Sequence, residues 1–219
     1  MRSSTRWLPG SALLAAAIYV LLWVAWAHRW SWVAGLDTPV LTGAHDFAAG
    51  HPGWVTGWDV FCTVLGPGAF RLVGAVVIVA ALWRRRIRTA VFLLVTVEGS
   101  ALVTELAKAL ADRPRPATAL VDAWGTAFPS GHALGVLVAV AAYLTVARPA
   151  LTARARLGWA VTGAAVVVTI GVGRVLLNVH HPTDVLAGWA LGYAYFVGCR
   201  LALPLMPAAG TPAAPDNST

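Results

Sequence analysis

Charged residues are scarce in this chain: they make up 11% of its 219 residues, whereas a typical soluble domain carries about 25%. So few charges cannot cover a water-exposed surface, which excludes an ordinary soluble globular domain. Hydrophobic residues reach 58% and the mean hydropathy is +0.71, which excludes disordered and fibrous chains. The composition therefore indicates a membrane protein.

Cysteine and acidic residues are also rare. The two cysteines, Cys62 and Cys199, form no Cys-x-x-Cys pair and no cluster with histidine, which argues against a structural zinc or iron–sulfur site. In the topology below they lie about a membrane thickness apart, too far to form a disulfide. No group of carboxylates resembles a magnesium site. We therefore expect no metal and no other cofactor.

Six largely apolar runs indicate helices that cross a bilayer, for which about 20 apolar residues are needed. They cover residues 7–27, 68–83, 89–110, 129–147, 157–173 and 182–203. We predict an all-α, polytopic membrane protein: a six-transmembrane-helix bundle over residues 1–203. Residues 204–219 are rich in Pro, Ala and small polar side chains, and we expect them to form a disordered cytoplasmic tail.

The basic residues indicate the orientation of this bundle. The net charge is +7, from 16 Lys and Arg against 9 Asp and Glu, and an excess of arginine marks cytoplasmic loops. Nine arginines fall on one side: Arg2, Arg6, Arg84, Arg85, Arg86, Arg88, Arg148, Arg154 and Arg156. Both termini are therefore predicted to be cytoplasmic, and the loops after the third and fifth helices extracytoplasmic. Because the membrane explains the positive charge, we expect no nucleic-acid partner.

The first run has a second interpretation. Two arginines, an apolar stretch and the sequence Ala25-Trp26-Ala27 resemble a cleavable signal peptide. The run is longer than a usual signal-peptide core, and the bulky Trp23 and Trp26 lie close to the supposed cleavage site. We therefore favour a retained helix.

Ionisable residues in or beside membrane spans are costly and mark functional sites. Here they form three groups at the predicted outer ends of helices three to six. The groups are residues 108–116, 128–132 and 174–184. Lys108, Arg115 and Arg174 would supply three cations whose donors match the oxygens of a phosphate. Ser130 and Gly131 open the fourth helix, and the free N–H groups of a helix start can hold an anion.

Two histidines lie in different groups, His132 in the second and His180 in the third. One can attack phosphorus while the other protonates the leaving oxygen. Asp184 can accept a proton from an imidazole nitrogen and fix the tautomer of the attacking ring. Charge would then be stabilised by organic donors instead of a metal.

These groups resemble the signature of the type 2 phosphatidic acid phosphatase (PAP2) family, which reads Lys-x6-Arg-Pro, Pro-Ser-Gly-His and Ser-Arg-x5-His-x3-Asp. Lys108 precedes Arg115 by the required spacing, and residues 129–132 match completely. The third motif is complete over residues 174–184, but Gly173 replaces the preceding serine. Three motifs in order and in register make the resemblance specific.

The resemblance implies a metal-independent phosphatase that works through a phosphohistidine. It makes His180 the nucleophile and Asp184 its orienting carboxylate, while His132 protonates the leaving group and later activates water. The residues that would bind the phosphoryl oxygens are Lys108, Arg115, Ser130, Gly131 and Arg174. We expect the missing serine to weaken phosphate binding or alter preference without abolishing activity.

Neighbouring residues have plainer interpretations. Lys108 is the only lysine in the chain and could form a helical ion pair with Glu105, but its motif position favours phosphate binding. Arg113 is expected to give only electrostatic help. His181 is expected to be an interfacial aromatic residue beside the pocket.

The favoured function is hydrolysis of a membrane lipid phosphate at the extracytoplasmic face of the cell membrane. The resemblance suggests phosphatidate, phosphatidylglycerol phosphate or a polyprenyl diphosphate, and an outward-facing site favours the diphosphate of a carrier lipid. Two alternatives stay open: phosphoryl transfer to an alcohol or sugar, and a non-enzymatic lipid-binding or transport protein. The expected partners are the lipid substrate and the bilayer, and no pattern bears on the oligomeric state.

Overall fold

The computed structural model describes residues 7–205, and within this range the regular structure is entirely helical, with no strand. A π-helical turn (Leu94–Glu98) joins two helices, and a 3-10 turn (Arg148–Ala150) extends another. The α-helices are α1 (Leu8–Ala27), α2 (Ser31–Ala49), α3 (Pro52–Val64), α4 (Pro67–Trp83), α5 (Ile87–Leu93), α6 (Gly99–Ala111), α7 (Gly131–Ala147), α8 (Ala153–Leu176) and α9 (Pro182–Ala202).

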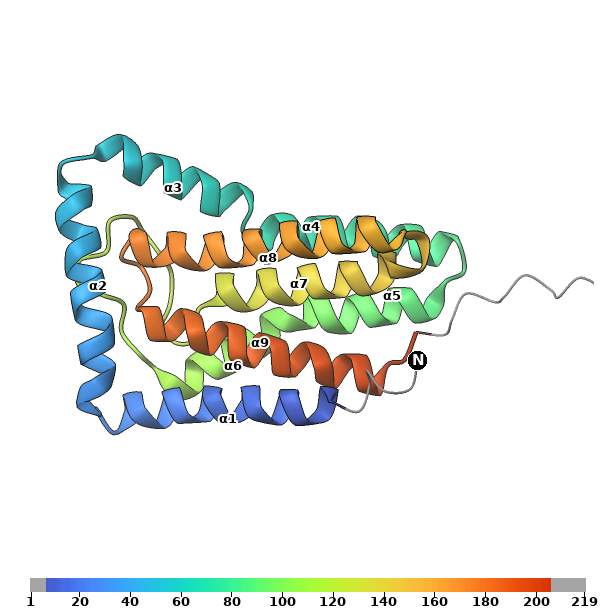
Figure 1. The fold of residues 1–219 in the computed structure, drawn as a ribbon, viewed down its shortest axis with the longest axis horizontal. Coiled ribbons are helices and arrows are strands. Elements are labelled where there is room, and N and C mark those ends of the chain that lie inside the picture. Colours follow the sequence, from blue (N-terminus) through green and yellow to red (C-terminus); the bar gives the residue numbers. More distant parts are fainter. Residues whose placement is uncertain (1–6, 206–219) are drawn as a thin grey trace, which may run out of the picture.

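The long helices lie side by side along the long axis of the molecule, whereas α2 lies across one end of the bundle (Figure 1). We refer to this end as the α2 end. Helix α3 leads back from α2 toward α4. The turns between α4 and α5 and between α7 and α8 lie at the opposite end.

Six helical segments are long and apolar enough to cross a membrane. They are Leu8–Ala27, Pro52–Trp83, Ile87–Ala111, Gly131–Ala150, Ala153–Leu176 and Pro182–Ala202. The predicted all-α, multi-pass membrane fold is therefore confirmed. Five of the six predicted runs agree with these segments to within a few residues at each end.

The second span and the segment before it differ from the prediction. This span begins at Pro52 instead of near Gly68, and its two helices, α3 and α4, meet at Gly66. Nothing in the sequence predicts α2, because Asp37 and Asp46 interrupt its apolar residues. An amphipathic helix at the end of a bundle leaves no long apolar run.

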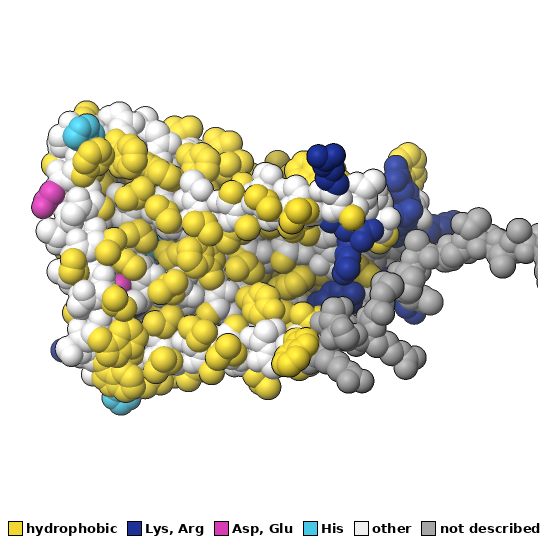
Figure 2. Space-filling model, in the orientation of Figure 1, with side chains coloured by type: hydrophobic (Ala, Val, Ile, Leu, Met, Phe, Trp, Pro, Cys, Tyr) yellow, Lys and Arg dark blue, Asp and Glu magenta, His cyan; other side chains and the backbone are white. Residues whose placement is uncertain are grey.

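Large apolar side chains face outward along the bundle, as contact with lipid requires (Figure 2). Leu13, Leu110 and Val161 illustrate this, with 72%, 74% and 62% of their surface exposed. Arginine side chains gather at the end opposite α2, where the turns hold basic residues 84–88 and 148–156. The surface is therefore apolar along its length and basic at one end.

Two expectations fall outside the described residues. Arg2 and Arg6, which contribute to the predicted orientation, precede residue 7. The predicted tail lies beyond Leu205 except for its first two residues.

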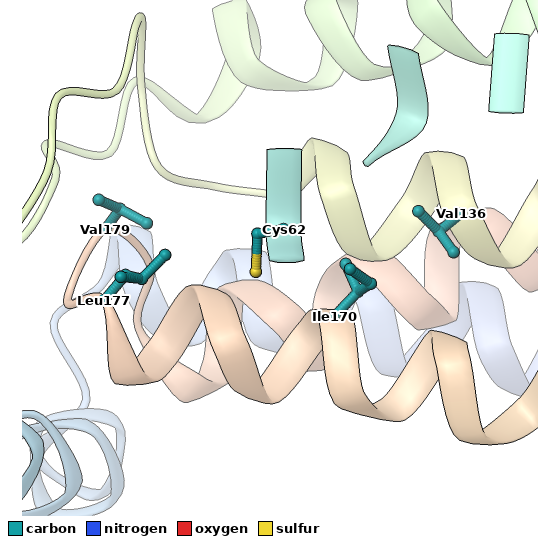
Figure 3. Packing of buried hydrophobic residues seen from close by; sticks show 5 residues of the cluster. All are labelled: Cys62, Val136, Ile170, Leu177 and Val179. Carbon is teal, nitrogen blue, oxygen red and sulfur yellow. The ribbon is translucent and has the colours of Figure 1, made fainter. Parts of the chain in front are cut away.

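A buried apolar cluster joins α3 to α7 and α8 (Figure 3). Its members are Cys62, Val136, Ile170, Leu177 and Val179. Leu177 and Val179 belong to the segment that connects α8 to α9. Their packing therefore anchors this connection, which carries part of the third motif, to the core.

Helices α7 and α9 approach closely because α9 has glycines at the contact. A Cβ at Gly188 would lie 2.6 Å from the carbonyl oxygen of Ser130 and 3.0 Å from Cβ of Ala133. A Cβ at Gly192 would lie 3.1 Å from the carbonyl oxygen of Leu134. Small residues at helix contacts are the usual means of close packing in membranes.

Gly188→Ala should therefore separate α7 from α9 at the second motif. Overpacking of this kind costs about 1–3 kcal/mol, so we expect a lower thermal unfolding temperature in detergent together with reduced activity. Gly198→Ala is the matched control, since a Cβ there meets nothing within 4 Å on the same helix. Equal stability of the two variants would contradict the close contact.

Candidate active site

The three motif groups meet at the α2 end, at the ends of the third to sixth spans. Lys108 lies in the last turn of α6, His132 in the first turn of α7, and Arg174 in the last turn of α8. His180 lies between α8 and α9. Nη1 of Arg115 lies 3.3 Å from Nε2 of His180, and the N–H of Ser130 donates to the carbonyl oxygen of Asp184, so residues far apart in the sequence form one site.

The start of α7 is held by its neighbours. Ser130 is fully buried, and its Oγ accepts a hydrogen bond from the N–H of Ala133 at 3.5 Å. The N–H of Ser130 donates to the carbonyl oxygen of Asp184 at 2.9 Å. A Cβ at Gly131 would lie 3.0 Å from Thr104 Cγ2. The second motif is thus fixed against both α9 and α6.

His132 has a neighbour that no sequence motif identifies. Gly66 lies at the junction of α3 and α4, and a Cβ at this position would lie 3.2 Å from Nε2 of His132. It would also lie 2.5 Å from the carbonyl oxygen of Cys62. Only glycine fits here, and its absent side chain leaves room beside the imidazole.

The His180 segment is buried and held from two sides. His180 is 1% exposed, and its N–H donates to the carbonyl oxygen of Arg174 at 3.3 Å. Asn178 adopts the left-handed conformation, with φ of 52°. Its Nδ2 donates to the carbonyl oxygen of Leu41 at 3.1 Å. Helix α2 therefore helps to position the segment that carries His180.

Asp184 is fully buried and contacts two histidines unequally. Its Oδ2 lies 3.7 Å from Nδ1 of His180, beyond hydrogen-bond distance. The same oxygen accepts hydrogen bonds from the backbone N–H of His181 at 2.8 Å and is 3.0 Å from Nδ1 of His181. His181 is therefore more than the interfacial aromatic residue expected from the sequence.

Arg113 is the second contact of Asp184. It is 3% exposed, and its Nη1 donates to Oδ1 of Asp184 at 2.6 Å and to Oγ1 of Thr183 at 2.8 Å. Its Nη2 donates to Oδ2 of Asp37 at 2.7 Å. The expected electrostatic help from Arg113 is thus a set of direct hydrogen bonds, and Asp37 is a residue that the sequence motifs do not identify.

The three cations of the motifs have different surroundings. Nη1 and Nη2 of Arg115 donate to the carbonyl oxygens of Val179 and Trp124, each at 2.6 Å. Arg174 is 6% exposed, and its Nε has no hydrogen-bond partner within residues 7–205. Nζ of Lys108 lies 3.9 Å from the exposed carboxylate of Glu105. In the described chain, no group of three or more His, Cys, Asp and Glu side chains is placed to hold a metal ion.

Two site residues outside the spans have altered proton affinities. Burial is the main cause that lowers the pKa of His180 to about 4; the carboxylate of Asp184 opposes this, and Arg115 and Arg174 add to it. Burial also lowers the pKa of the Arg115 guanidinium. Nη1 of Arg115 lies 3.3 Å from Nε2 of His180. A neutral His180 imidazole beside a cation is the state in which a histidine can attack phosphorus.

Comparison with known proteins shows which family has these motifs. The model of the PAP2 superfamily matches residues 89–205. The chain belongs to the PAP2 superfamily. It is 33% identical to phosphatidylglycerophosphatase B of Bacillus subtilis (strain 168) over 139 residues, which are 61% of this chain and 68% of that protein. The predicted PAP2 resemblance and the expected phosphoric ester hydrolase are therefore confirmed.

A solved structure shares the PAP2 fold. It is described as the first transmembrane PAP2 type phosphatidylglycerolphosphate phosphatase from Bacillus subtilis, and it superposes with a TM-score of 0.76 at 20% identity. The match covers 88% of this chain and 95% of that chain. Since it extends beyond residues 89–205, the fold is shared well outside the part that the family model describes.

Gly173 is the one departure from the PAP2 motifs, and its surroundings explain it. A Cβ at this position would lie 2.7 Å from Sγ of Cys62 and 2.7 Å from Cε3 of Trp58. The side chains of α3 therefore occupy the space in which the family serine would lie. Because Gly173 directly precedes Arg174, this packing brings α3 next to the arginine of the third motif.

Restoring the family serine should consequently lower activity. The Gly173→Ser side chain must displace Cys62 and Trp58, and overpacking of this kind costs about 1–3 kcal/mol. We expect the same displacement to shift the adjacent Arg174 and so to raise KM. Adding Cys62→Ala should recover part of the loss, because only the Trp58 contact remains. Gly158→Ser on the same helix is the control, since a Cβ there meets nothing within 4 Å. Higher activity of Gly173→Ser than of the wild type would contradict this explanation.

Proposed function

We propose that this protein hydrolyses a phosphomonoester or diphosphate of a membrane lipid through a covalent phosphohistidine on His180. The observation that carries the proposal is the convergence of two histidines with three cations at one end of a membrane bundle; one histidine lies at the start of α7 and the other between α8 and α9. His180 is buried beside Asp184, while His132 begins the helix whose N-terminus faces the same region. Membership of the PAP2 superfamily supports a lipid phosphate as the substrate.

The contacts of His180 suggest a different role for each of its two ring nitrogens. Nδ1 is directed toward the Asp184 carboxylate, and Nε2 lies 3.3 Å from the guanidinium of Arg115. A proton on Nδ1 leaves the lone pair on Nε2, which would attack phosphorus once the N–H of Arg115 turns to a phosphoryl oxygen. Although 3.7 Å is long for a hydrogen bond, such contacts often tighten when substrate binds.

The reaction has two steps. In the first, Nε2 of His180 forms a bond to phosphorus, the bond from phosphorus to the lipid oxygen breaks, and His132 gives its proton to that oxygen. In the second, His132 takes a proton from water, whose oxygen attacks phosphorus while the P–N bond breaks. Inorganic phosphate leaves, and both histidines return to their starting states.

Negative charge on the phosphoryl oxygens would be stabilised by Lys108, Arg115 and Arg174, together with Ser130 and Gly131 at the start of α7. The side chain of Arg174 is buried, and its Nε has no hydrogen-bond partner within the described residues. Fixed donors in a water-poor site stabilise developing charge more strongly than the same donors in water. The chemistry proposed here uses no metal.

The bundle also supports an orientation in the membrane. The two turns that hold basic residues 84–88 and 148–156 lie opposite the α2 end, and the start of α1 lies on the same side as these turns (Figure 1). Arginine-rich short turns are retained in the cytoplasm. We therefore place this end in the cytoplasm with both termini, and the active site at the extracytoplasmic surface of the cell membrane.

Such a site would take a lipid whose phosphate reaches the outer boundary of the bilayer. The candidates are phosphatidate, phosphatidylglycerol phosphate and a polyprenyl diphosphate, of which the second is the one suggested by the name of the Bacillus subtilis relative. Phosphate release from each purified lipid, with and without an added alcohol acceptor, would identify the head group. The same assay separates hydrolysis from phosphoryl transfer, because transfer yields a phosphorylated acceptor.

His180→Ala should abolish phosphate release and the labelling of the protein by substrate phosphate. His132→Ala should slow turnover by about 10²–10⁴-fold, the usual contribution of a general acid. The control is His28→Ala, which alters an exposed histidine outside the site. Wild-type turnover in His180→Ala, or loss of activity in EDTA that magnesium restores, would rule out this mechanism.

The low proton affinity of His180 predicts that activity persists to unusually low pH. Its pKa of about 4 keeps the imidazole neutral, and hence nucleophilic, at all higher pH values. The groups around it are Asp184, Arg115, Arg174 and His132, and His181 shares the carboxylate of Asp184. We expect kcat/KM to persist below pH 6 and to fall only near pH 4. If a monoester and a diphosphate substrate give the same fall of kcat/KM at low pH, the titrating group belongs to the protein and not to the substrate. A fall centred near pH 6.5 for both substrates would contradict the low pKa of His180.

A further inference from the structure

Helix α2 contributes one buried carboxylate to the α2 end. Asp37 is 2% exposed, although α2 lies across the outside of the bundle. Its Oδ1 accepts from the N–H of Thr183 at 3.0 Å, and its Oδ2 accepts from Oγ1 of Thr183 and from Nη2 of Arg113, each at 2.7 Å. Burying a carboxylate is costly unless it is paired and hydrogen-bonded. The three donors to Asp37 therefore offset the cost of its burial.

The guanidinium of Arg113 connects this carboxylate to the catalytic region. One nitrogen binds Asp37 and the other binds Asp184, at 2.7 Å and 2.6 Å. Because guanidinium is planar and rigid, fixing one side of the fork fixes the direction of the other. The position of Asp37 therefore determines where Oδ1 of Asp184 is held, and with it the aim of Oδ2 at the two histidines.

The balance of charge gives the same conclusion. Asp184 must remain available to an imidazole if it is to orient His180. A buried Arg113 without Asp37 would direct its full charge at Asp184 and compete with the histidines for that carboxylate. With Asp37 present, the single cation is shared between two acids.

We infer that Asp37 is a positioning residue for the phosphatase reaction, acting through Arg113 on Asp184. The inference rests on the proposed function, because it concerns the orientation of the proposed nucleophile. It gives α2, which belongs to none of the three motifs, a part in positioning the catalytic groups. Asp37 touches neither phosphate nor a reacting atom, so it is not a catalytic residue.

The test is Asp37→Asn, measured as kcat and KM on lipid phosphate in detergent micelles and normalised to folded protein. We expect kcat to fall by about 10- to 100-fold, the loss seen when the partners that orient metal-bound histidines are removed. KM should stay unchanged, since Lys108, Arg115 and Arg174 are not altered. The matched control is Asp46→Asn, which removes an exposed carboxylate from the same helix and should leave kcat unchanged.

A double-mutant cycle separates positioning from general stability. If Asp37 acts through Arg113, Asp37→Asn should cause no further loss of kcat in an Arg113→Met background. A loss of the same size in both backgrounds would overturn the inference, as would wild-type kcat in Asp37→Asn. Should Asp37→Asn fail to fold, Asp37→Glu retains the charge and shifts it by one methylene; wild-type kcat in that variant overturns the inference equally.

Failure of this inference can be told apart from failure of the proposed function. Activity that survives His180→Ala removes the phosphohistidine mechanism, whatever Asp37 does. An inactive His180→Ala together with a fully active Asp37→Asn removes only the positioning role.

Discussion

The buried guanidinium of Arg113 is the charge on which the α2 end depends. It holds one carboxylate from α2 and one from α9, and it lies 4.7 Å from the ring centroid of Trp26 in α1. A buried charge that loses its partner is destabilised by about 3–5 kcal/mol. Arg113 therefore links residues of α1, α2 and α9 beside the segment that carries His180.

The sequence predicts most of the bundle and much of the candidate site, for two physical reasons. Lipid requires long apolar runs, so five spans are visible with nearly correct ends. Phosphate chemistry requires particular side chains at fixed spacing, so Lys108, His132 and His180 can be singled out before any coordinates. The structure brings these residues to the same end of the bundle, although Lys108 and His132 lie on different helices and His180 lies between two others.

What the sequence could not predict depends on contacts between distant segments. Asp37 pairs with residues 76 and 146 positions away, and it lies on an amphipathic helix that leaves no apolar run. The adjacent His180 and His181 are indistinguishable by composition, yet only the second is within 3.0 Å of the Asp184 carboxylate. Gly173 is explained by side chains of α3, which packs beside α8 only after folding.

Basic residues serve two separate purposes in this chain. Arginines crowd the end opposite α2, whereas the chain's only lysine, Lys108, lies in the proposed phosphate site with 14% of its side chain exposed. A reagent that acylates lysine therefore has a single side-chain target in the whole protein. Protection of that one amine by a lipid phosphate would report occupancy of the site directly, without turnover and without an engineered label.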